Sequence, residues 1–130
     1  MNVNAAGRFL VATPTLVGPP FERSVVLIVE HDSTGAVGVV INLDTEVAVA
    51  EVLPDLAVPV VAPDVVFVGG PVSTDTAVIL GRSRTGPFTM AAPGTDVGIV
   101  ALDALPSDLS DVRVYAGYSG WSPGQLEAEL

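Results

Sequence analysis

Apolar residues occur along this chain in short runs separated by turn-forming residues, a pattern typical of β-strands. The clearest run is Val25–Val29, which predicts a strand buried on both faces. It leads into the triplet Glu30-His31-Asp32. Because charged groups are not buried unpaired, this end of the strand must meet solvent or a cleft. We therefore predict a strand over Arg23–His31 whose polar end is accessible.

The same pattern predicts a chain built mainly from strands. Val65–Val68 and Ala77–Leu80 are short apolar runs that we expect to be neighbouring strands. The segment from Gly81 to Gly94 is expected to be a loop, since it is rich in Gly, Pro and Thr. The other strands are expected over Arg8–Thr13, Ala36–Asn42, Val97–Leu102 and Val112–Tyr118.

Two short helices are expected between these strands and after them. The first covers Glu46–Leu53, with Asp44 or Thr45 as its N-cap and Pro54 just beyond its end. The second begins at Ser122 as N-cap, and a proline occupies its first helical position.

Glycines mark the sharpest turns of the predicted sheet. Asp32–Gly35 is expected to form a hairpin loop in which Gly35 takes a positive φ. Gly38, inside the next strand, predicts a bulge or a close approach of two backbones. Gly69 and Gly70 are expected to end the strand Val65–Val68.

Composition and charge narrow the classes of function. The 130 residues suit one domain, and 49% of them are apolar, which is enough for a packed core. The net charge is −10, and all five basic residues are arginines without a basic run, which argues against direct nucleic-acid binding. The absence of cysteine excludes disulfides and thiolate zinc sites. No signal peptide or membrane-length apolar run occurs, so we expect a cytoplasmic protein that contacts no membrane.

The triplet Glu30-His31-Asp32 is the first candidate for chemistry, because it contains the single histidine. Histidine titrates near neutral pH and suits a general base, and a neighbouring carboxylate would orient it. A metal site needs several converging ligands, whereas neighbours in a strand point to opposite faces. We therefore favour a structural or hydrogen-bonding role for His31 over a ligand-binding role, and expect no metal site.

The segment Gly117-Tyr118-Ser119-Gly120-Trp121 follows a predicted strand and precedes a predicted helix, as the G-x-S-x-G nucleophile elbow does. Trp121 occupies the place of the final glycine. The only histidine also precedes the serine, which reverses the hydrolase order. We therefore predict a strand-to-helix turn anchored by the rings of Tyr118 and Trp121, without a catalytic residue.

Three further features could bind an anion, and each has a simpler interpretation. Gly69-Gly70-Pro71 could present backbone N–H groups, but no P-loop lysine accompanies it, so a glycine turn is favoured. Arg23 could clamp a carboxylate or a phosphate, but it has acidic neighbours in Glu22 and Glu30, which favour a structural ion pair. Asn42 ends a strand, where a turn-forming role is expected.

Several blocks of the chain have a specific order and composition: Gly7–Pro14, Phe21–Val26, Glu30–Asp32, Gly35–Gly38, Val40–Asn42, Gly69–Val72 and Gly117–Glu127. Together they resemble the YqgE/AlgH family of bacterial proteins. Leu43 and Asp44 depart from the usual basic residue and proline of that family, and the chain stops within a GQLE segment that family members usually extend. We therefore expect a single YqgE/AlgH-like domain over 1–130 without its C-terminal portion, which would leave an apolar surface or an unpaired sheet edge.

The resemblance implies an α+β fold: a mixed, mostly antiparallel, bent or barrel-like sheet flanked by a few short helices. It implies no established enzymatic activity, cofactor or catalytic residue. The family name is associated with the regulation of alginate synthesis. Since the negative charge argues against direct DNA contact, we expect a transcription-associated role to act through another protein.

These observations predict a non-enzymatic binding or regulatory module without a cofactor, and they leave its oligomeric state open. The alternative hypothesis is a small-molecule enzyme in which His31 acts as acid or base and Glu30 or Asp32 orients it. The expected contact surface is formed by polar residues and glycines at strand ends: Arg23, Glu30, His31, Asn42, Gly69, Gly70 and Trp121.

Overall fold

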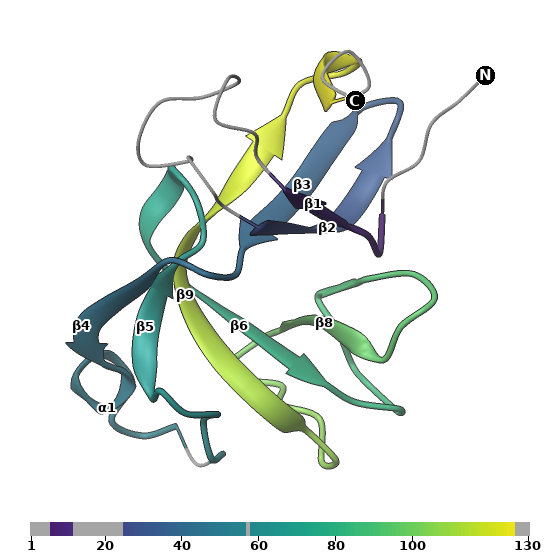
Figure 1. The fold of residues 1–130 in the computed structure, drawn as a ribbon. Helices are drawn as coiled ribbons and strands as arrows, with labels where there is room; N and C mark the ends of the chain where they lie inside the picture. Colours follow the sequence, from purple (N-terminus) through teal and green to yellow (C-terminus); the bar gives the residue numbers. More distant parts are fainter. Residues whose placement is uncertain (1–5, 12–24, 57, 127–130) are drawn as a thin grey trace.

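The strands of this chain curl into a half-barrel of mostly antiparallel sheet with very little helix (Figure 1). The structure is a computed structural model that describes residues 6–11, 25–56 and 58–126. It confirms the expected bent sheet, although the helices that flank it are few. Its elements are β1 (Phe9–Val11), β2 (Val25–Asp32), β3 (Gly35–Val40), β4 (Asp44–Ala48), α1 (Val49–Val52), β5 (Val65–Val68), β6 (Val72–Arg82), β7 (Met90–Ala91), β8 (Val97–Val100) and β9 (Ser110–Trp121).

Strand β9 lies at the centre of the sheet and joins its two halves. Its C-terminal part pairs antiparallel with β3, with Ser119 opposite Gly38. Its N-terminal part lies between two other strands, because Tyr115 is paired with Phe67 of the parallel β5 and with Val78 of the antiparallel β6. The prediction that β5 and β6 are neighbours is therefore wrong, since β9 separates them.

The β2–β3 hairpin matches the expectations from its glycines. Ser33 and Thr34 form the turn, and the Asp32 carboxylate accepts a 2.8 Å hydrogen bond from the Thr34 N–H. Gly35 has a φ of 137°, as predicted. The register shifts between Ile28 and Glu30, opposite Gly38. A Cβ at Gly38 would lie 3.0 Å from the carbonyl oxygen of Leu27, which confirms the predicted close approach of two backbones.

The helix expected over Glu46–Leu53 is confirmed only for Val49–Val52, because Glu46–Ala48 belong to a strand. Residues up to Ala48 form β4, which pairs with β5, and only Val49–Val52 are helical. The Thr45 hydroxyl donates to the carbonyl of Val66 at 2.6 Å and therefore caps no helix. Pairing with β5 outweighs the local preference, because β-branched residues such as those of this segment fit a pleated sheet.

The segment after β9 begins as a turn. The Ser122 N–H and hydroxyl both donate to the Gln125 side-chain oxygen, at 2.9 and 3.1 Å. Gly124 has a φ of +77°, so the predicted helix does not start at Pro123. Helical residues begin at Gln125, and residues 127–130 lie outside the described part of the chain.

The core consists of three apolar clusters, separated by the sheet. Alternate residues of β9 point to opposite faces, so Val112 and Val114 contribute to one cluster and Tyr115 to another. The inner cluster, inside the curl, comprises Leu27, Val29, Val39, Phe67, Val78, Leu80 and Tyr115. The lower cluster comprises Val49, Val66, Ile79, Val100, Val112 and Val114. The upper cluster comprises Val26, Ile28, Ala36, Val40 and Leu126.

Candidate functional site

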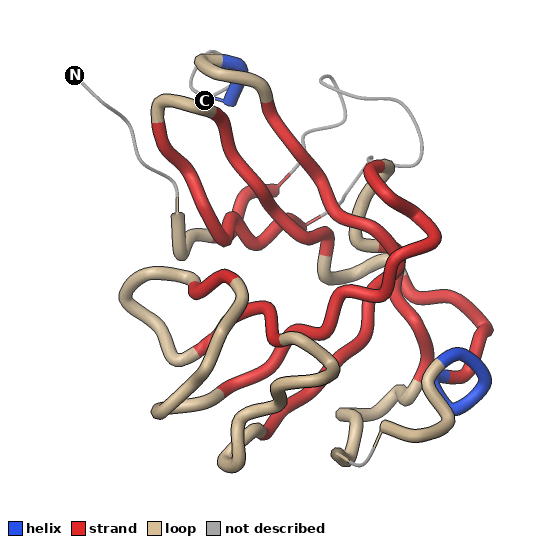
Figure 2. The backbone as a smooth tube through the Cα atoms, turned by 180° about the vertical axis from the view of Figure 1, so that it is seen from behind, coloured by secondary structure: helices blue, strands red, loops and turns tan. Residues whose placement is uncertain are grey.

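A cavity of about 290 Å³ lies inside the curl, between the two halves of the sheet. Figure 2 shows these halves facing each other, with β2 and β3 in one half and β6 and β8 in the other. Most of the wall is apolar, and the polar groups come from β6 and β9. The lining residues are Phe9, Leu27, Ile41, Val61, Leu80, Gly81, Arg82, Val97, Asp111, Arg113 and Tyr115.

Arg113 brings a positive charge into this apolar cavity. It lies on β9 two residues before Tyr115, so both side chains project from the same face of the strand. The Cζ atom of Arg113 lies 5.0 Å from the centre of the Phe67 ring, within the range of a cation–π contact. Among the described residues, no carboxylate forms an ion pair with this half-buried guanidinium. The described groups that contact this guanidinium are the Phe67 ring and the Tyr115 hydroxyl, and both are neutral.

Tyr115 lies on the same face of β9 as Arg113 and is 2% exposed. Its ring centre is 5.6 Å from that of Phe67, with the planes tilted by 48°. Burial raises the pKa of the Tyr115 phenol above its ordinary value of 10.0, and the nearby Arg113 opposes this shift by its charge and by hydrogen bonding. The phenol therefore stays protonated at neutral pH and keeps a hydrogen-bond donor beside Arg113.

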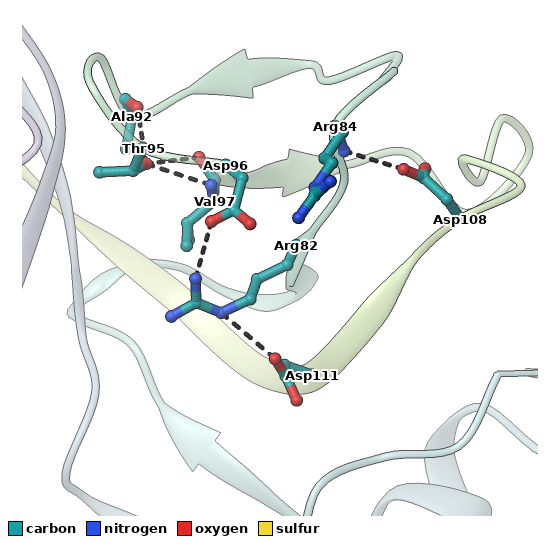
Figure 3. A network of polar contacts seen from close by, with 8 residues as sticks. All are labelled: Arg82, Arg84, Ala92, Thr95, Asp96, Val97, Asp108 and Asp111. Carbon is teal, nitrogen blue, oxygen red and sulfur yellow. Dashed lines mark hydrogen bonds and ion pairs between the residues drawn. The ribbon is translucent and has the colours of Figure 1, made fainter.

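The second arginine of the cavity, Arg82, is already paired (Figure 3). One of its terminal nitrogens lies 2.7 Å from a carboxylate oxygen of Asp96, and its Nε lies 3.2 Å from a carboxylate oxygen of Asp111. These contacts connect β6, the segment before β8, and β9 at the rim. Two carboxylates thus balance the charge of Arg82, whereas no described carboxylate pairs with Arg113.

The loop after β6 is held by Asp108, close to this rim. The Asp108 carboxylate accepts hydrogen bonds from the hydroxyls of Ser83 and Thr85. It also accepts one from the Arg84 N–H (Figure 3). The Ser83 bond and then the Arg84 bond are the main reasons why the pKa of Asp108 falls from 3.8 to about 2. The carboxylate is therefore charged at neutral pH and fixes the backbone of this loop.

The structure brings two of the sequence-predicted site residues together. Ala36 is paired with His31 on one side and with Trp121 on the other, so the three residues form a row across β2, β3 and β9. Directly opposite residues share a face of the sheet, and this row lies beside the upper cluster. His31 is 4% exposed, so its imidazole is buried.

The remaining predicted site residues are distributed over other positions. Glu30 is exposed on the opposite face of β2. The Asn42 side-chain oxygen accepts a 2.8 Å bond from the Val25 N–H and closes the end of the β2–β3 pair. A Cβ at Gly69 would lie 2.3 Å from the carbonyl oxygen of Gly117, and one at Gly70 would lie 2.2 Å from that of Tyr118.

Arg23 lies outside the described residues, and none of the other predicted site residues lines the cavity. Their role as a common contact surface therefore stays a prediction. The sequence did not predict a functional role for Arg113 or Tyr115, or the ion pairs of Arg82. A signal for the first two was present, because Val112-Arg113-Val114-Tyr115 alternates with the period of a strand and places Arg113 and Tyr115 on one face.

The described residues lack two further features. They contain no group of three or more His, Asp or Glu side chains arranged to hold a metal ion. In the same part of the chain, no helix has both the length and the apolar character needed to cross a membrane.

Comparisons with known proteins point to one family. The AlgH-like family model matches residues 9–130. The UPF0301 protein of Mycolicibacterium gilvum is 44% identical over 134 residues, which cover 96% of this chain and 66% of that protein. The UPF0301 protein of Streptomyces coelicolor is 46% identical over 134 residues, which cover 95% of this chain and 69% of that protein. This chain thus spans about two thirds of the length of these curated relatives.

Two solved structures share the fold. The crystal structure of a Corynebacterium diphtheriae protein has a TM-score of 0.82 and 32% identity, covering 98% of this chain and 72% of that one. The solution structure of the AlgH protein from Pseudomonas aeruginosa has a TM-score of 0.70 and 33% identity, covering 94% of this chain and 70% of that one.

Proposed function

Since the chain belongs to the AlgH-like family, we propose that it is a cytoplasmic, non-enzymatic binding or regulatory module whose ligand enters the cavity inside the half-barrel. The observation that supports this proposal is Arg113, a cation without a carboxylate partner among the described residues, in a cavity with mostly apolar walls. Apolar walls with a few well-placed polar groups are typical of small-molecule sites.

Binding is favoured over catalysis because the two residues that the sequence offered for catalysis, His31 and Ser119, do not line the cavity. His31 is buried and does not line the cavity. The Ser119 hydroxyl is buried as well, and it donates to the Gly69 carbonyl at 3.2 Å. The alternative hypothesis, an enzyme with His31 as acid or base, therefore gains no support from the cavity.

The regulatory part of the proposal concerns a protein partner. With a net charge of −10, direct contact with DNA is disfavoured, so a transcription-associated role would act through a second protein. The predicted contact residues Glu30, Asn42 and Trp121 are at least partly exposed. They lie on different parts of the sheet, so each remains a separate proposed contact residue for that partner.

The proposal is tested by screening a library of small molecules against the isotopically labelled chain by NMR. We expect a subset of compounds to shift the amide signals of Leu80, Val97 and Tyr115 and to remain chemically unchanged during long incubation. A Val97→Phe variant should lose these shifts because the larger ring fills the cavity. A Val47→Phe variant, altered at an exposed position on β4, should keep them.

Two results would contradict the proposal. Conversion of a bound compound into a product would show that the chain is an enzyme. Shifts that survive Val97→Phe would show that the ligands bind outside the cavity.

A further inference from the structure

We infer that the cavity recognises a small organic monocarboxylate, whose carboxylate pairs with the Arg113 guanidinium and whose apolar body lies against the cavity walls. This inference rests on the proposed binding function and specifies its ligand. Nothing in the sequence motifs pointed to this site.

The first argument is the hydrogen-bonding capacity of Arg113. A guanidinium carries five N–H donors in a planar fork that matches the two oxygens of a carboxylate. The contact with the Phe67 ring balances part of the charge but supplies no lone pair to these donors. No carboxylate of the described residues pairs with Arg113. The Tyr115 hydroxyl accepts from the guanidinium, and a bound carboxylate would supply acceptors for its other donors.

The second argument is the polar neighbour beside Arg113. Tyr115 is buried on the same face of β9 as Arg113, and its hydroxyl is hydrogen-bonded to the guanidinium. A protonated phenol can donate one further hydrogen bond to an anion held by Arg113. The cavity thus combines a cation with a neutral donor, a pair of groups that suits a single carboxylate.

The third argument limits the charge of the ligand. Arg82 is compensated by Asp96 and Asp111, so Arg113 is the one cation of the cavity lining that is not paired with a described carboxylate. Asp111 also places a negative charge at the rim, and the whole chain carries a net charge of −10. A ligand with two or more negative charges would be repelled, so a monoanion fits better than a phosphate dianion.

The fourth argument limits the size and polarity of the ligand. The volume of about 290 Å³ lies near the lower end of the range found for ligand pockets. The walls around Arg113 are formed by Leu27, Ile41, Leu80 and Val97. Burial of a ring or a short alkyl chain against these side chains is favourable because it removes apolar surface from water. The ligand is therefore expected to be small and apolar apart from its carboxylate.

The test compares benzoate with benzyl alcohol, a neutral molecule with the same ring. We expect benzoate to shift the amide signals of Leu80, Val97 and Tyr115 saturably, and benzyl alcohol to bind at least about tenfold more weakly, because it makes no charge-assisted bond. Rising salt should weaken benzoate binding and leave benzyl alcohol binding unchanged.

Matched variants locate the charge responsible. Arg113→Gln should weaken benzoate binding at least about tenfold. Arg84→Gln removes the same charge from an exposed position that does not line the cavity, and should leave the affinity within about twofold. Arg113→Lys retains a charge but loses the planar fork, so we expect an intermediate affinity. It serves as the second variant if Arg113→Gln does not fold.

Failure of the carboxylate inference can be distinguished from failure of the proposed binding function. Equal binding of benzoate and benzyl alcohol, or an unchanged benzoate affinity in Arg113→Lys and Arg113→Gln, would overturn the carboxylate inference and leave the binding function standing. The absence of any cavity ligand, from these probes and from the compound library together, would overturn both.

Discussion

At the scale of single residues, the polar and glycine positions that attract attention in the sequence mostly hold the backbone together. Asn42 closes the β2–β3 pair, and Ser119 bonds to the Gly69 carbonyl. Gly69 itself donates to Ala116 and accepts from Val40, at 2.9 Å each. This glycine therefore connects β3 and β9 at the point where the two halves of the sheet meet.

The structural role of Gly69 is tested by Gly69→Ala. The new methyl group would lie 2.3 Å from the Gly117 carbonyl oxygen, so we expect a loss of about 1–3 kcal/mol in the free energy of unfolding by urea. Gly120→Ala is the matched control, because its methyl group would approach no atom closer than 4.0 Å. This control should leave stability unchanged or raise it by up to about 1 kcal/mol. Equal effects of the two variants would refute the steric explanation.

Asp108 is expected to make the stability of the fold depend on pH. Its pKa is lowered from 3.8 to about 2 by the hydrogen bonds from Ser83 and Arg84. A lowered folded-state pKa contributes stability that is present above the unfolded value and is lost as the pH falls toward the folded value. Urea unfolding should therefore show a loss of stability between pH 3.8 and about 2 that Asp108→Asn reduces. Asp103→Asn, at an exposed position in the same segment between β8 and β9, should retain the wild-type pH dependence.

At the scale of elements, β9 makes the largest contribution to the architecture. It is the only described strand that pairs with three others, β3, β5 and β6. Its residues alternate between the inner and lower clusters, so a single strand anchors two apolar layers. Substitutions within β9 should therefore cost more than equal substitutions in the peripheral β4.

Val114→Ala tests this difference. Val114 is 0% exposed, and the loss of its methyl groups should reduce the free energy of unfolding by about 2 kcal/mol. Val47→Ala on β4 removes the same groups from a side chain that is 42% exposed, and should cost less than about 0.5 kcal/mol. Denaturant titration of both variants provides the comparison, and a similar cost at the two sites would argue against the central role of β9.

Some strands of this protein can be predicted from the local sequence, whereas other features depend on residues far away in the chain. The apolar runs of β2, β5 and β9 are correctly predicted as strands because apolar composition alone favours a strand there. The turn expected over Gly117–Trp121 is wrong, since these residues continue β9. The conversion of Glu46–Ala48 to a strand depends on pairing with β5, about 20 residues away, which no local pattern encodes. The separation of β5 and β6 by β9 is likewise a long-range property. The cavity residues Arg113 and Tyr115 were not predicted for a different reason: they belong to no known motif, and only their alternation in sequence places them on one face of a strand.

At the scale of the whole molecule, charge is the dominant property. The chain carries 15 carboxylates and 5 arginines, and Arg82 is paired with two carboxylates. A uniformly negative molecule repels polyanions, and this repulsion is strongest at low ionic strength.

We therefore expect no binding of duplex DNA at low salt, measured by fluorescence anisotropy with a basic peptide as the positive control for the assay. Low salt is the most favourable condition for electrostatic association with DNA, so a negative result there is decisive. Saturable binding that weakens with salt would contradict the proposed action through a protein partner.

The central position of β9 has a consequence for the synthesis of this protein. Strands β3, β5 and β6 all precede β9 in the chain, yet each of them pairs with residues of Ser110–Trp121. Until the ribosome has released that segment, the two halves of the half-barrel cannot be joined, and several strand edges stay without a neighbour. The nascent chain is therefore expected to need protection from aggregation during translation and to complete its fold only after β9 has emerged.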